Sequence, residues 1–325
     1  MNRFKNILYV LNDQIGEPSA SLIRAISLAK NNQAALTLLH VLPKLSLSSY
    51  ATQAGIGKQE LKTKIFEHEQ SALDGLRSLL DQSLTIKTDF RVGKKHIESI
   101  RAVQAGNFDL VVKEVDAIAW FDRFLGSDDM DLLRKCPCPV WLIKKDEKTD
   151  YRHIMAAVDF DTNDEDTGQK GSGKNELNRM ILDMASSQAL SNFSSLDVVN
   201  AYDVPEAGII SLWVDQPAKF EREMLESEYR QKARRMDMLL QELKQHLGTE
   251  SYNYLSPRSH LVQGIPGQEI PEMAKKVKAD LIVMGTVART GIAGIVIGNT
   301  AESILFQLNC SVLAIKPPGF VSPVS

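Results

Sequence analysis

The sequence repeats itself once, and this internal duplication limits the possible folds more than any other feature. Three segments of the first half return in the second half in the same order, 147, 171 and 172 residues further along the chain. The first-half segments begin at Asn6, Asp109 and Cys138, and their counterparts begin at His153, Asp280 and Cys310. The spacing predicts two copies of a domain of about 150 residues. The copies span 1–147 and 151–325 and are joined near 147–151.

Each copy alternates short apolar strand patterns with longer amphipathic helix patterns. The strand patterns cover 6–12, 35–42, 85–91, 109–113 and 139–144, and then 153–159, 195–201, 258–263, 280–284 and 311–316. The helix patterns cover 18–32, 58–82, 95–106 and 128–135, and then 175–191, 217–247, 267–278 and 299–308. This alternation predicts an α/β fold in which each domain has a five-stranded, mainly parallel sheet with helices on both faces. Ligands of such sheets bind beyond the carboxyl ends of the strands, where strand order reverses.

Composition narrows the class of protein. Lys and Arg number 38 against 41 Asp and Glu, a net charge of −3, which disfavours direct nucleic-acid binding because such binding needs a surplus of cations. No apolar run approaches the roughly 20 residues of a membrane span, and the N-terminus runs into the first strand pattern without a signal-peptide core. Cys136, Cys138 and Cys310 are too few for a disulfide framework and are expected to be packed thiols. These features predict a protein of the reducing cytoplasm.

The strongest local motif is a glycine-rich stretch after the fourth strand pattern of the second copy. Its residues of interest are Gly285, Ala288, Gly291, Gly298, Asn299 and Thr300. Glycines let the backbone turn tightly and approach an anion, and the free N–H groups at the start of the following helix favour a phosphate. The same stretch also fits a plain loop in which Asn299 or Thr300 caps the helix. A phosphate site and a flexible loop therefore both remain open from the glycines alone.

The duplication, the segment 154–159, the glycine-rich stretch and the segment 132–141 together resemble the universal stress protein family, specifically its tandem-domain type, over nearly the whole chain. The resemblance implies two flavodoxin-like domains, related to the adenine-nucleotide alpha-hydrolases, that form a pseudo-dimer in which the last strands pair. It also implies a stress-response protein that binds ATP, with or without Mg²⁺, in its second domain. Its implied role is regulatory or protective and includes resistance to DNA-damaging stress.

The resemblance also assigns roles to individual residues. It implies that Asp159 contacts the adenosine and that a backbone amide near Val199 reads the adenine, although Asp159 also suits a turn or a helix cap after a strand. The nucleotide-binding branch of the family has Gly-x-x-Gly, nine residues, and then Gly-Ser/Thr. Here Ala288 stands at the second glycine and Asn299 follows the last one. The match is partial, because an alanine held at positive φ costs on the order of 1 kcal/mol or more.

The first copy departs further from that pattern. Glu114 stands where the second copy has Gly285, Ala117 stands at the place of Ala288, and Asn12 replaces the aspartate. Trp120 and Phe121 fall in the loop, and only Gly126-Ser127 is kept at the helix start. A carboxylate at Glu114 would repel a polyphosphate. The first domain is therefore expected to be a structural partner, with a non-nucleotide ligand left open.

Two alternative functions remain open from the sequence. The apolar segment 207–214 follows a strand and must pack against the domain, face a partner, or wall a pocket. A pocket there would make the second domain a carrier of an amphiphilic or nucleotide-linked lipid. The other alternative is a slow ATP hydrolase, although no catalytic residue and no set of metal ligands can be assigned. A homodimer of tandem chains and unidentified protein partners also remain open.

Overall fold

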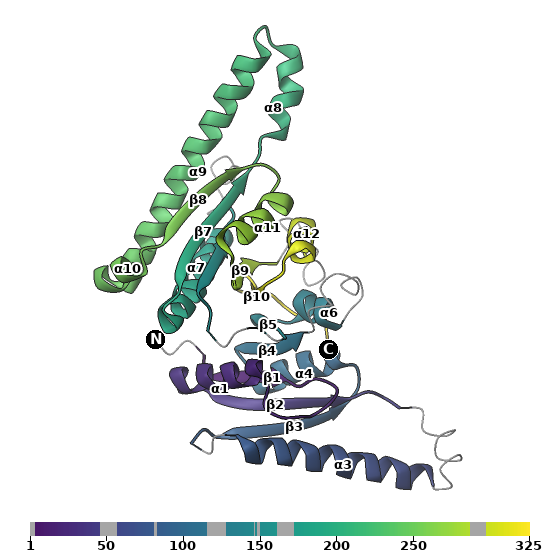
Figure 1. The fold of residues 1–325 in the computed structure, drawn as a ribbon. Coiled ribbons are helices and arrows are strands. Elements are labelled where there is room, and N and C mark those ends of the chain that lie inside the picture. Colours follow the sequence, from purple (N-terminus) through teal and green to yellow (C-terminus); the bar gives the residue numbers. More distant parts are fainter. Residues whose placement is uncertain are drawn as a thin grey trace. The chain divides into compact units, whose positions relative to one another are not determined.

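The protein was analysed as a computed structural model that describes residues 4–45, 57–80, 83–115, 128–145, 147, 150–160, 172–286 and 297–325. It divides into two compact units (Figure 1). The first unit is Met1–Thr149 together with Val321–Ser325, and the second is Asp150–Phe320. Each unit is an α/β domain with its own parallel sheet.

The first unit has five described strands and four described helices. They are β1 (Asn6–Val10), α1 (Ala20–Asn32), β2 (Ala35–Leu42), α3 (Lys58–Leu79), β3 (Ile86–Val92), α4 (Lys95–Gly106), β4 (Leu110–Val115), α6 (Asp128–Lys135) and β5 (Val140–Lys144). The strand order is β3-β2-β1-β4-β5, and every neighbouring pair is parallel. Strand order therefore reverses between β1 and β4, which is where such folds bind ligands.

The second unit repeats this plan with additional helices. Its elements are β6 (His153–Ala157), α7 (Ser172–Asn192), β7 (Ser195–Tyr202), α8 (Pro205–Ile210), the 3₁₀ turn η1 (Ser211–Trp213), α9 (Pro217–Leu247), α10 (Thr249–Leu255), β8 (Arg258–Gln263), α11 (Pro266–Val277), β9 (Leu281–Gly285), α12 (Asn299–Gln307) and β10 (Ser311–Ile315). The order β8-β7-β6-β9-β10 is again parallel throughout. The reversal here lies between β6 and β9.

The central strands form the core of each unit because helices cover both faces of the sheet. In the second unit α7 and α9 pack on one face, and α11, joined by α12, packs on the other. Ile7 and Leu8 of β1, like Ile282 and Val283 of β9, are completely buried. Side chains on both faces of these strands are apolar, as expected of a parallel sheet whose two faces are both covered by helices.

The two sheets keep the same register, so positions in one unit have defined counterparts in the other. The N–H of Leu11 donates to the carbonyl of Leu39 at 2.9 Å, and the N–H of Val158 donates to that of Val199 at 2.9 Å. By this register His40 of β2 corresponds to Asn200 of β7.

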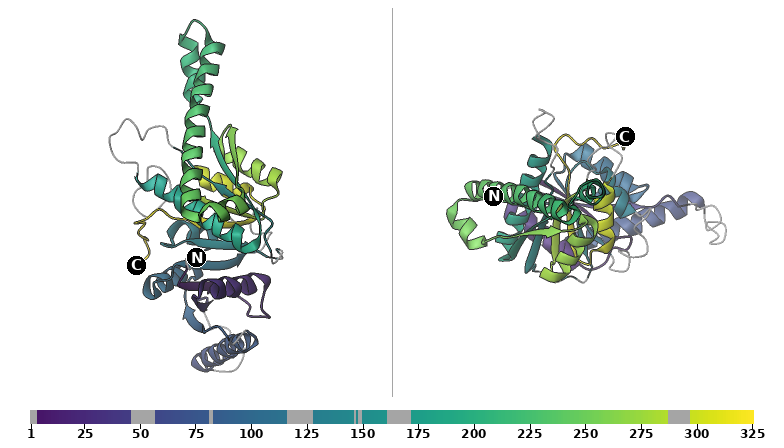
Figure 2. Two further views of the ribbon diagram at one scale, coloured as in Figure 1. Left: turned by 90° about the vertical axis from the view of Figure 1, so that its left-hand side faces the viewer. Right: turned by 90° about the horizontal axis from the view of Figure 1, so that it is seen from above.

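Two segments differ from the sequence-based expectation. The segment 207–214 forms α8 and η1, because Pro205 occupies the first turn of a short helix. Gly248, with φ 78°, ends α9 and is followed by α10, which the sequence patterns did not predict. Figure 2 shows α9 as one continuous helix whose first half, with α8, extends beyond the strands of this unit.

The last five residues return to the first unit. The side chain of Arg101 in α4 donates to the carbonyl of Ser325 at 3.0 Å, and that of Gln104 donates to the carbonyl of Val324 at 2.9 Å. Among the described residues, no helix is both long and apolar enough to span a membrane.

Candidate functional site

The carboxyl edge of the second sheet brings together three of the residues identified from the sequence. β6 and β9 are neighbouring parallel strands, so Asp159 and Gly285 leave the sheet side by side where strand order reverses. The N–H of Gly298 donates to the carbonyl of Thr286 at 3.2 Å, which ties the start of α12 to the end of β9. Asp159, Gly285 and Gly298 therefore border one edge of the sheet.

The start of α12 has the properties of an anion site. Gly298 occupies the N-cap position with φ −63° and ψ 139° and, as a glycine, has no side chain that could make the capping hydrogen bond. Asn299 and Thr300 are the first two helical residues, and both are exposed. Neither is therefore the cap, which was one expectation for them. The first N–H groups of a helix have no partner within it, and the N-cap residue here supplies no side chain to them.

Asp159 follows β6 and is held through its backbone. The buried amide of Asn178 in α7 accepts from the N–H of Asp159 at 3.1 Å and donates to its carbonyl at 2.8 Å. The turn is therefore fixed by Asn178, while the side chain of Asp159 is exposed. This arrangement fixes the backbone of Asp159 at the edge of the sheet.

Val199 lies inside β7, three residues before the strand ends at Tyr202. Its side chain is fully buried, and its carbonyl accepts the hydrogen bond from Val158. The next residue, Asn200, is 1% exposed, and its Nδ2 donates to the carbonyl of Val158 at 3.0 Å. Among the described residues nothing donates to its Oδ1. Sequence reasoning missed Asn200. The duplication aligns Asn200 with His40, so a polar residue at the same strand position in both copies was the signal that could have identified it.

The reason for glycine at 285 is packing rather than backbone conformation. A Cβ added at Gly285 would lie 2.9 Å from Cδ2 of Leu177 in α7, which is closer than Cβ atoms in proteins come to other heavy atoms. Gly285 therefore lets α7 pack directly on the end of β9. This partner is 108 residues away in the sequence, so the local motif could not reveal it.

Two buried lysines flank the same edge of the sheet. Nζ of Lys316, just after β10, donates to Oγ1 of Thr286 at 2.8 Å and lies 4.9 Å from the centre of the Phe320 ring. Lys232 of α9 donates to the carbonyl of Phe160. As whole residues, Lys316 and Lys232 are 3% and 6% exposed. Both cations were missed by sequence reasoning, because nothing in their local pattern distinguishes them from surface lysines.

Two residues of the predicted phosphate loop, Ala288 and Gly291, lie outside the described residues. The same holds for the first-copy residues Ala117, Trp120 and Phe121 and for Gly126-Ser127.

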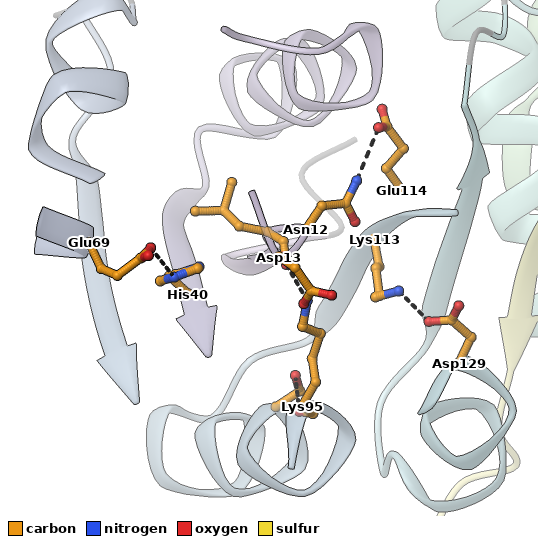
Figure 3. A network of polar contacts seen from close by, with 10 residues as sticks. Asn12, Asp13, His40, Glu69, Lys95, Lys113, Glu114 and Asp129 are labelled. Carbon is orange, nitrogen blue, oxygen red and sulfur yellow. Dashed lines mark hydrogen bonds and ion pairs between the residues drawn. The ribbon is translucent and has the colours of Figure 1, made fainter. Parts of the chain in front are cut away.

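The first unit has a carboxylate at the matching position. Oε1 of Glu114 accepts from Nδ2 of Asn12 at 3.2 Å, and Oε2 accepts from the hydroxyl of Ser21 at 2.6 Å. Figure 3 shows Asn12 directed at Glu114. The hydroxyls of Ser21 and Tyr9 are 2.6 Å apart, and burial raises the pKa of Tyr9. Glu114 is thus held in place by its neighbours, where the second unit has Gly285.

Further ion pairs occupy this edge of the first sheet (Figure 3). Asp129, in the first turn of α6, pairs with the buried Lys113 of β4. In the same turn, Asp128 pairs with His96 of α4. Lys95 pairs with Asp13 and donates to it a hydrogen bond that lowers the pKa of that carboxyl. The helix start that corresponds to Asn299 and Thr300 therefore already carries two carboxylates.

In the described part of the chain, the large apolar side chains of segment 207–214 face solvent rather than an enclosed pocket. Ile209, Ile210, Leu212 and Trp213 are between 44% and 85% exposed. A separate hollow of about 550 Å³ lies between α7 and α9, lined by Arg179, Asp183, Glu242 and His246 among others. Its residues come from the middle of α7 and the last turns of α9, so it does not include the strand ends.

The three cysteines are buried, and none of them forms a disulfide with another described residue. The sulfur atoms of Cys136 and Cys138 are 3.6 Å apart, and their hydrogen bond, followed by burial, raises the pKa of Cys138. Such a thiol stays protonated and unreactive. Within the described ranges, no three His, Cys, Asp or Glu side chains are grouped so as to hold a metal ion.

Comparison with known proteins gives one consistent result. The sequence profile described as "Universal stress protein family" matches residues 3–144 and 173–316. The chain is 28% identical over 324 residues to "Universal stress protein E homolog" of Haemophilus influenzae, covering 97% of this chain and 98% of the relative. It is 31% identical over 231 residues to "Universal stress protein E" of Photorhabdus laumondii, covering 69% of this chain and 67% of the relative.

Solved structures agree with the sequence comparison. A functionally unknown protein from Pseudomonas aeruginosa PAO1 superposes with a TM-score of 0.63 at 26% identity, covering 97% of this chain and 94% of the other. A universal stress protein from Archaeoglobus fulgidus DSM 4304 superposes with a TM-score of 0.57 at 14% identity, covering 96% of both chains. At that identity the second likeness supports the fold alone.

Proposed function

The chain belongs to the universal stress protein family, since the family profile covers both of its domains, and from this premise we propose that the second domain binds an adenine nucleotide. The proposed ligand is ATP, with or without Mg²⁺, bound at the carboxyl edge of the sheet. The proposed role is regulatory or protective in the cytoplasm and includes resistance to DNA-damaging stress.

The observation that carries the proposal is the contrast between the two equivalent helix starts. In α12 the N-cap is Gly298, and the first two helical residues are the neutral Asn299 and Thr300. In α6 the first turn holds Asp128, Asp129 and Asp131. A helix start favours anions through its free N–H groups and its dipole. That preference is met by carboxylates of the protein itself in α6, and it is available to phosphate groups in α12.

The strand ends beside α12 supply polar groups for the nucleoside. Asp159 presents an exposed carboxylate, which suits the hydroxyl groups of a ribose. Asn200 has a buried Oδ1 that accepts no hydrogen bond from the described residues, and such an acceptor suits the amino group of adenine. Leaving a buried acceptor unpaired costs about 1–3 kcal/mol, so a donor on a ligand would restore that free energy.

A test transfers the charges of α6 to α12. The double variant Asn299→Asp, Thr300→Asp should lower ATP affinity by at least about tenfold, or about 1.4 kcal/mol, because two carboxylates would meet the phosphates. The variant Asn299→Ala, Thr300→Ala is the uncharged control and should bind ATP as the natural chain does. Calorimetric titration of the full chain measures both. Unchanged ATP binding by the aspartate variant would contradict the proposal.

The thermal midpoint separates lost binding from lost folding. Acidic residues in the first turn of a helix stabilise it by about 0.3–1 kcal/mol. The aspartate variant should therefore unfold at the same temperature as the natural chain or a higher one, while binding ATP less tightly.

A further inference from the structure

Lys316 is a buried lysine that directly follows β10 and points toward the end of β9. The residue is 3% exposed, and its Nζ donates to Oγ1 of Thr286 at 2.8 Å. Thr286 directly follows β9 and is completely buried. Lysine side chains usually keep their ammonium group in water, because burial of a charge costs free energy. A cation that is turned inward at this edge of the sheet is therefore a candidate for a functional role.

A tight turn after β10 covers this lysine. The N–H of Phe320 donates to the carbonyl of Pro317 at 3.3 Å, and Gly319 within the turn has φ 78°. A type II turn needs such a positive φ at its third residue, which glycine adopts without strain. The turn brings the Phe320 ring back to 4.9 Å from Nζ of Lys316, where an aromatic face attracts a cation. The segment 316–320 therefore holds its own ammonium group in place.

A single residue connects the cation to the start of α12. Thr286 accepts the hydrogen bond of Lys316 on its side chain, and its carbonyl accepts from the N–H of Gly298 at 3.2 Å. Gly298 is the N-cap of α12, and the first N–H groups of a helix favour a phosphate. Lys316 thus places a fixed positive charge behind this helix start. Salt screens a buried charge much less than an exposed one.

The matching positions of the first unit are arranged differently. Val115 of β4 stands where Thr286 stands, 171 residues earlier, and Lys144 of β5 stands where Lys316 stands, 172 residues earlier. Val115 and Lys144 are register partners, but valine has no hydroxyl group that could accept a hydrogen bond, and Lys144 is only half-buried. Of these two matched pairs, the one with a buried cation and a hydroxyl partner belongs to the domain that we propose binds phosphate groups.

We propose that Lys316 makes the second domain select nucleotides with a long phosphate chain, so that ATP binds more tightly than AMP. This inference rests on the proposed function and adds the feature of the ligand that the site distinguishes. A fixed cation attracts ATP more strongly than AMP, because ATP carries more negative charge. Lys316 acts by its charge from behind Thr286 and is therefore a specificity-determining residue.

The test compares ATP and AMP by calorimetric titration of the full chain. The natural chain should bind ATP at least about tenfold more tightly than AMP. Lys316→Met keeps the length of the side chain but removes its charge, and should lower this ratio of affinities at least about fivefold. The effect should be smaller with Mg²⁺ present, because the bound metal ion offsets part of the charge of ATP. Lys144→Met is the matched control in the first unit and should leave the ratio unchanged.

Two further variants separate the charge of Lys316 from its packing. Lys316→Arg keeps the charge and should retain most of the preference for ATP. Thr286→Val installs the residue of the first unit, removes the hydroxyl partner of Lys316 and should also lower the ratio. This variant replaces Lys316→Met if that chain does not fold. Equal losses of affinity for ATP and AMP in Lys316→Met would overturn the inference, because a merely loosened helix start would weaken both ligands alike.

Failure of this inference gives a different result from failure of the proposed function. A chain that binds ATP with a ratio that Lys316→Met leaves unchanged contradicts the inference alone. A natural chain that binds neither nucleotide, with or without Mg²⁺, contradicts the proposed function. Inorganic tripolyphosphate, which has no base, then still tests Lys316. Binding of tripolyphosphate that Lys316→Met weakens at least about fivefold supports the inference, and the absence of such binding overturns it.

Discussion

Ser21 donates its hydroxyl hydrogen to Oε2 of Glu114 across 2.6 Å and so links the start of α1 to the end of β4. The same carboxylate accepts from Asn12, and it is 7% exposed. An internal carboxylate that accepts two hydrogen bonds stands in the first domain where the second domain has Gly285. Under the proposal made above, this difference would let one fold keep its strand order and still treat anions differently in its two copies.

Replacement of Glu114 by glutamine should destabilise the first domain without creating a nucleotide site. Glutamine keeps the shape but loses the charge that strengthens both hydrogen bonds, so the free energy of unfolding should fall by about 1–3 kcal/mol. Urea denaturation measures this loss. Glu60→Gln is the control, since Glu60 is exposed and pairs only with Lys64 at the surface, and should cost under about 1 kcal/mol. If Glu114→Gln gives the chain a second ATP site, the account of the first domain is wrong.

Gly285→Ala should be destabilising through Leu177 alone. The new methyl group would meet Cδ2 of Leu177 at 2.9 Å. The cost should be about 1 kcal/mol, the low end for overpacking, because that methyl group ends a half-buried side chain that can shift. Leu177→Ala in the same chain should remove most of that penalty. A double-mutant cycle on the free energy of unfolding should therefore show strong coupling between the two positions. Additive effects would mean that glycine is needed at 285 for another reason.

Gly298→Val tests whether the start of α12 approaches phosphate groups. Gly298 has extended backbone angles that valine also adopts, so the fold should be retained. The branched side chain would occupy the space beside the first N–H groups of the helix. ATP affinity, measured by calorimetry on the full chain, should fall at least about tenfold. Retained affinity would place the phosphates elsewhere.

Asn200 should determine which base is preferred. If its Oδ1 accepts from the amino group of adenine, the natural chain should bind ATP more tightly than purine riboside triphosphate, which lacks that group. Asn200→Ser should lose most of this difference, expected to be about tenfold or more because a buried acceptor is left unpaired. The ratio of the two affinities is the readout, since a general loosening of the loop after β6 would weaken both ligands equally. An unchanged ratio would remove Asn200 from base recognition.

His40 should make the first domain sensitive to acid. Burial lowers the pKa of His40 below its ordinary 6.5, and this effect exceeds the opposing one of Glu69, whose Oε2 lies 2.9 Å from Nε2. The unfolded chain therefore binds a proton more readily, and the free energy of unfolding should fall as the pH drops below about 6.5. His40→Asn, which installs the residue found at the matching place in β7, should reduce that slope. Urea midpoints between pH 5 and 7.5 give the comparison.

The strand positions could be predicted because buried parallel strands leave a local signal in their apolar runs. β2, at Ala35–Leu42, matches the predicted 35–42. The first strand was predicted to span 6–12 but ends at Val10. The prediction ran too far because Asn12 and Asp13 follow without an adjacent glycine or proline that would mark the end of the strand. The strand patterns themselves predicted no strand order, and only the family resemblance implied a flavodoxin-like arrangement.

The contacts between distant residues could not be predicted. Gly285 resembles a loop glycine until Leu177 is placed above it, and Glu114 gives no sign of its bond to Ser21, 93 residues earlier. The apolar segment 207–214 was expected to pack within the domain, wall a pocket or meet a partner, and hydrophobicity alone does not decide among these. α8 and η1 pack against the beginning of α9. Only this position shows that these side chains face solvent.

The hydrogen bonds from Arg101 and Gln104 to Ser325 and Val324 have a consequence for synthesis. Domains generally fold in order as the chain leaves the ribosome, yet α4 of the first unit receives these two acceptors only after the whole of the second unit has been made. The domain made first is thus completed by a segment that follows the second domain in the chain. A nascent chain that stops short of residue 321 would present α4 without its closing segment, so synthesis of the second domain sets the time at which the first domain is completed.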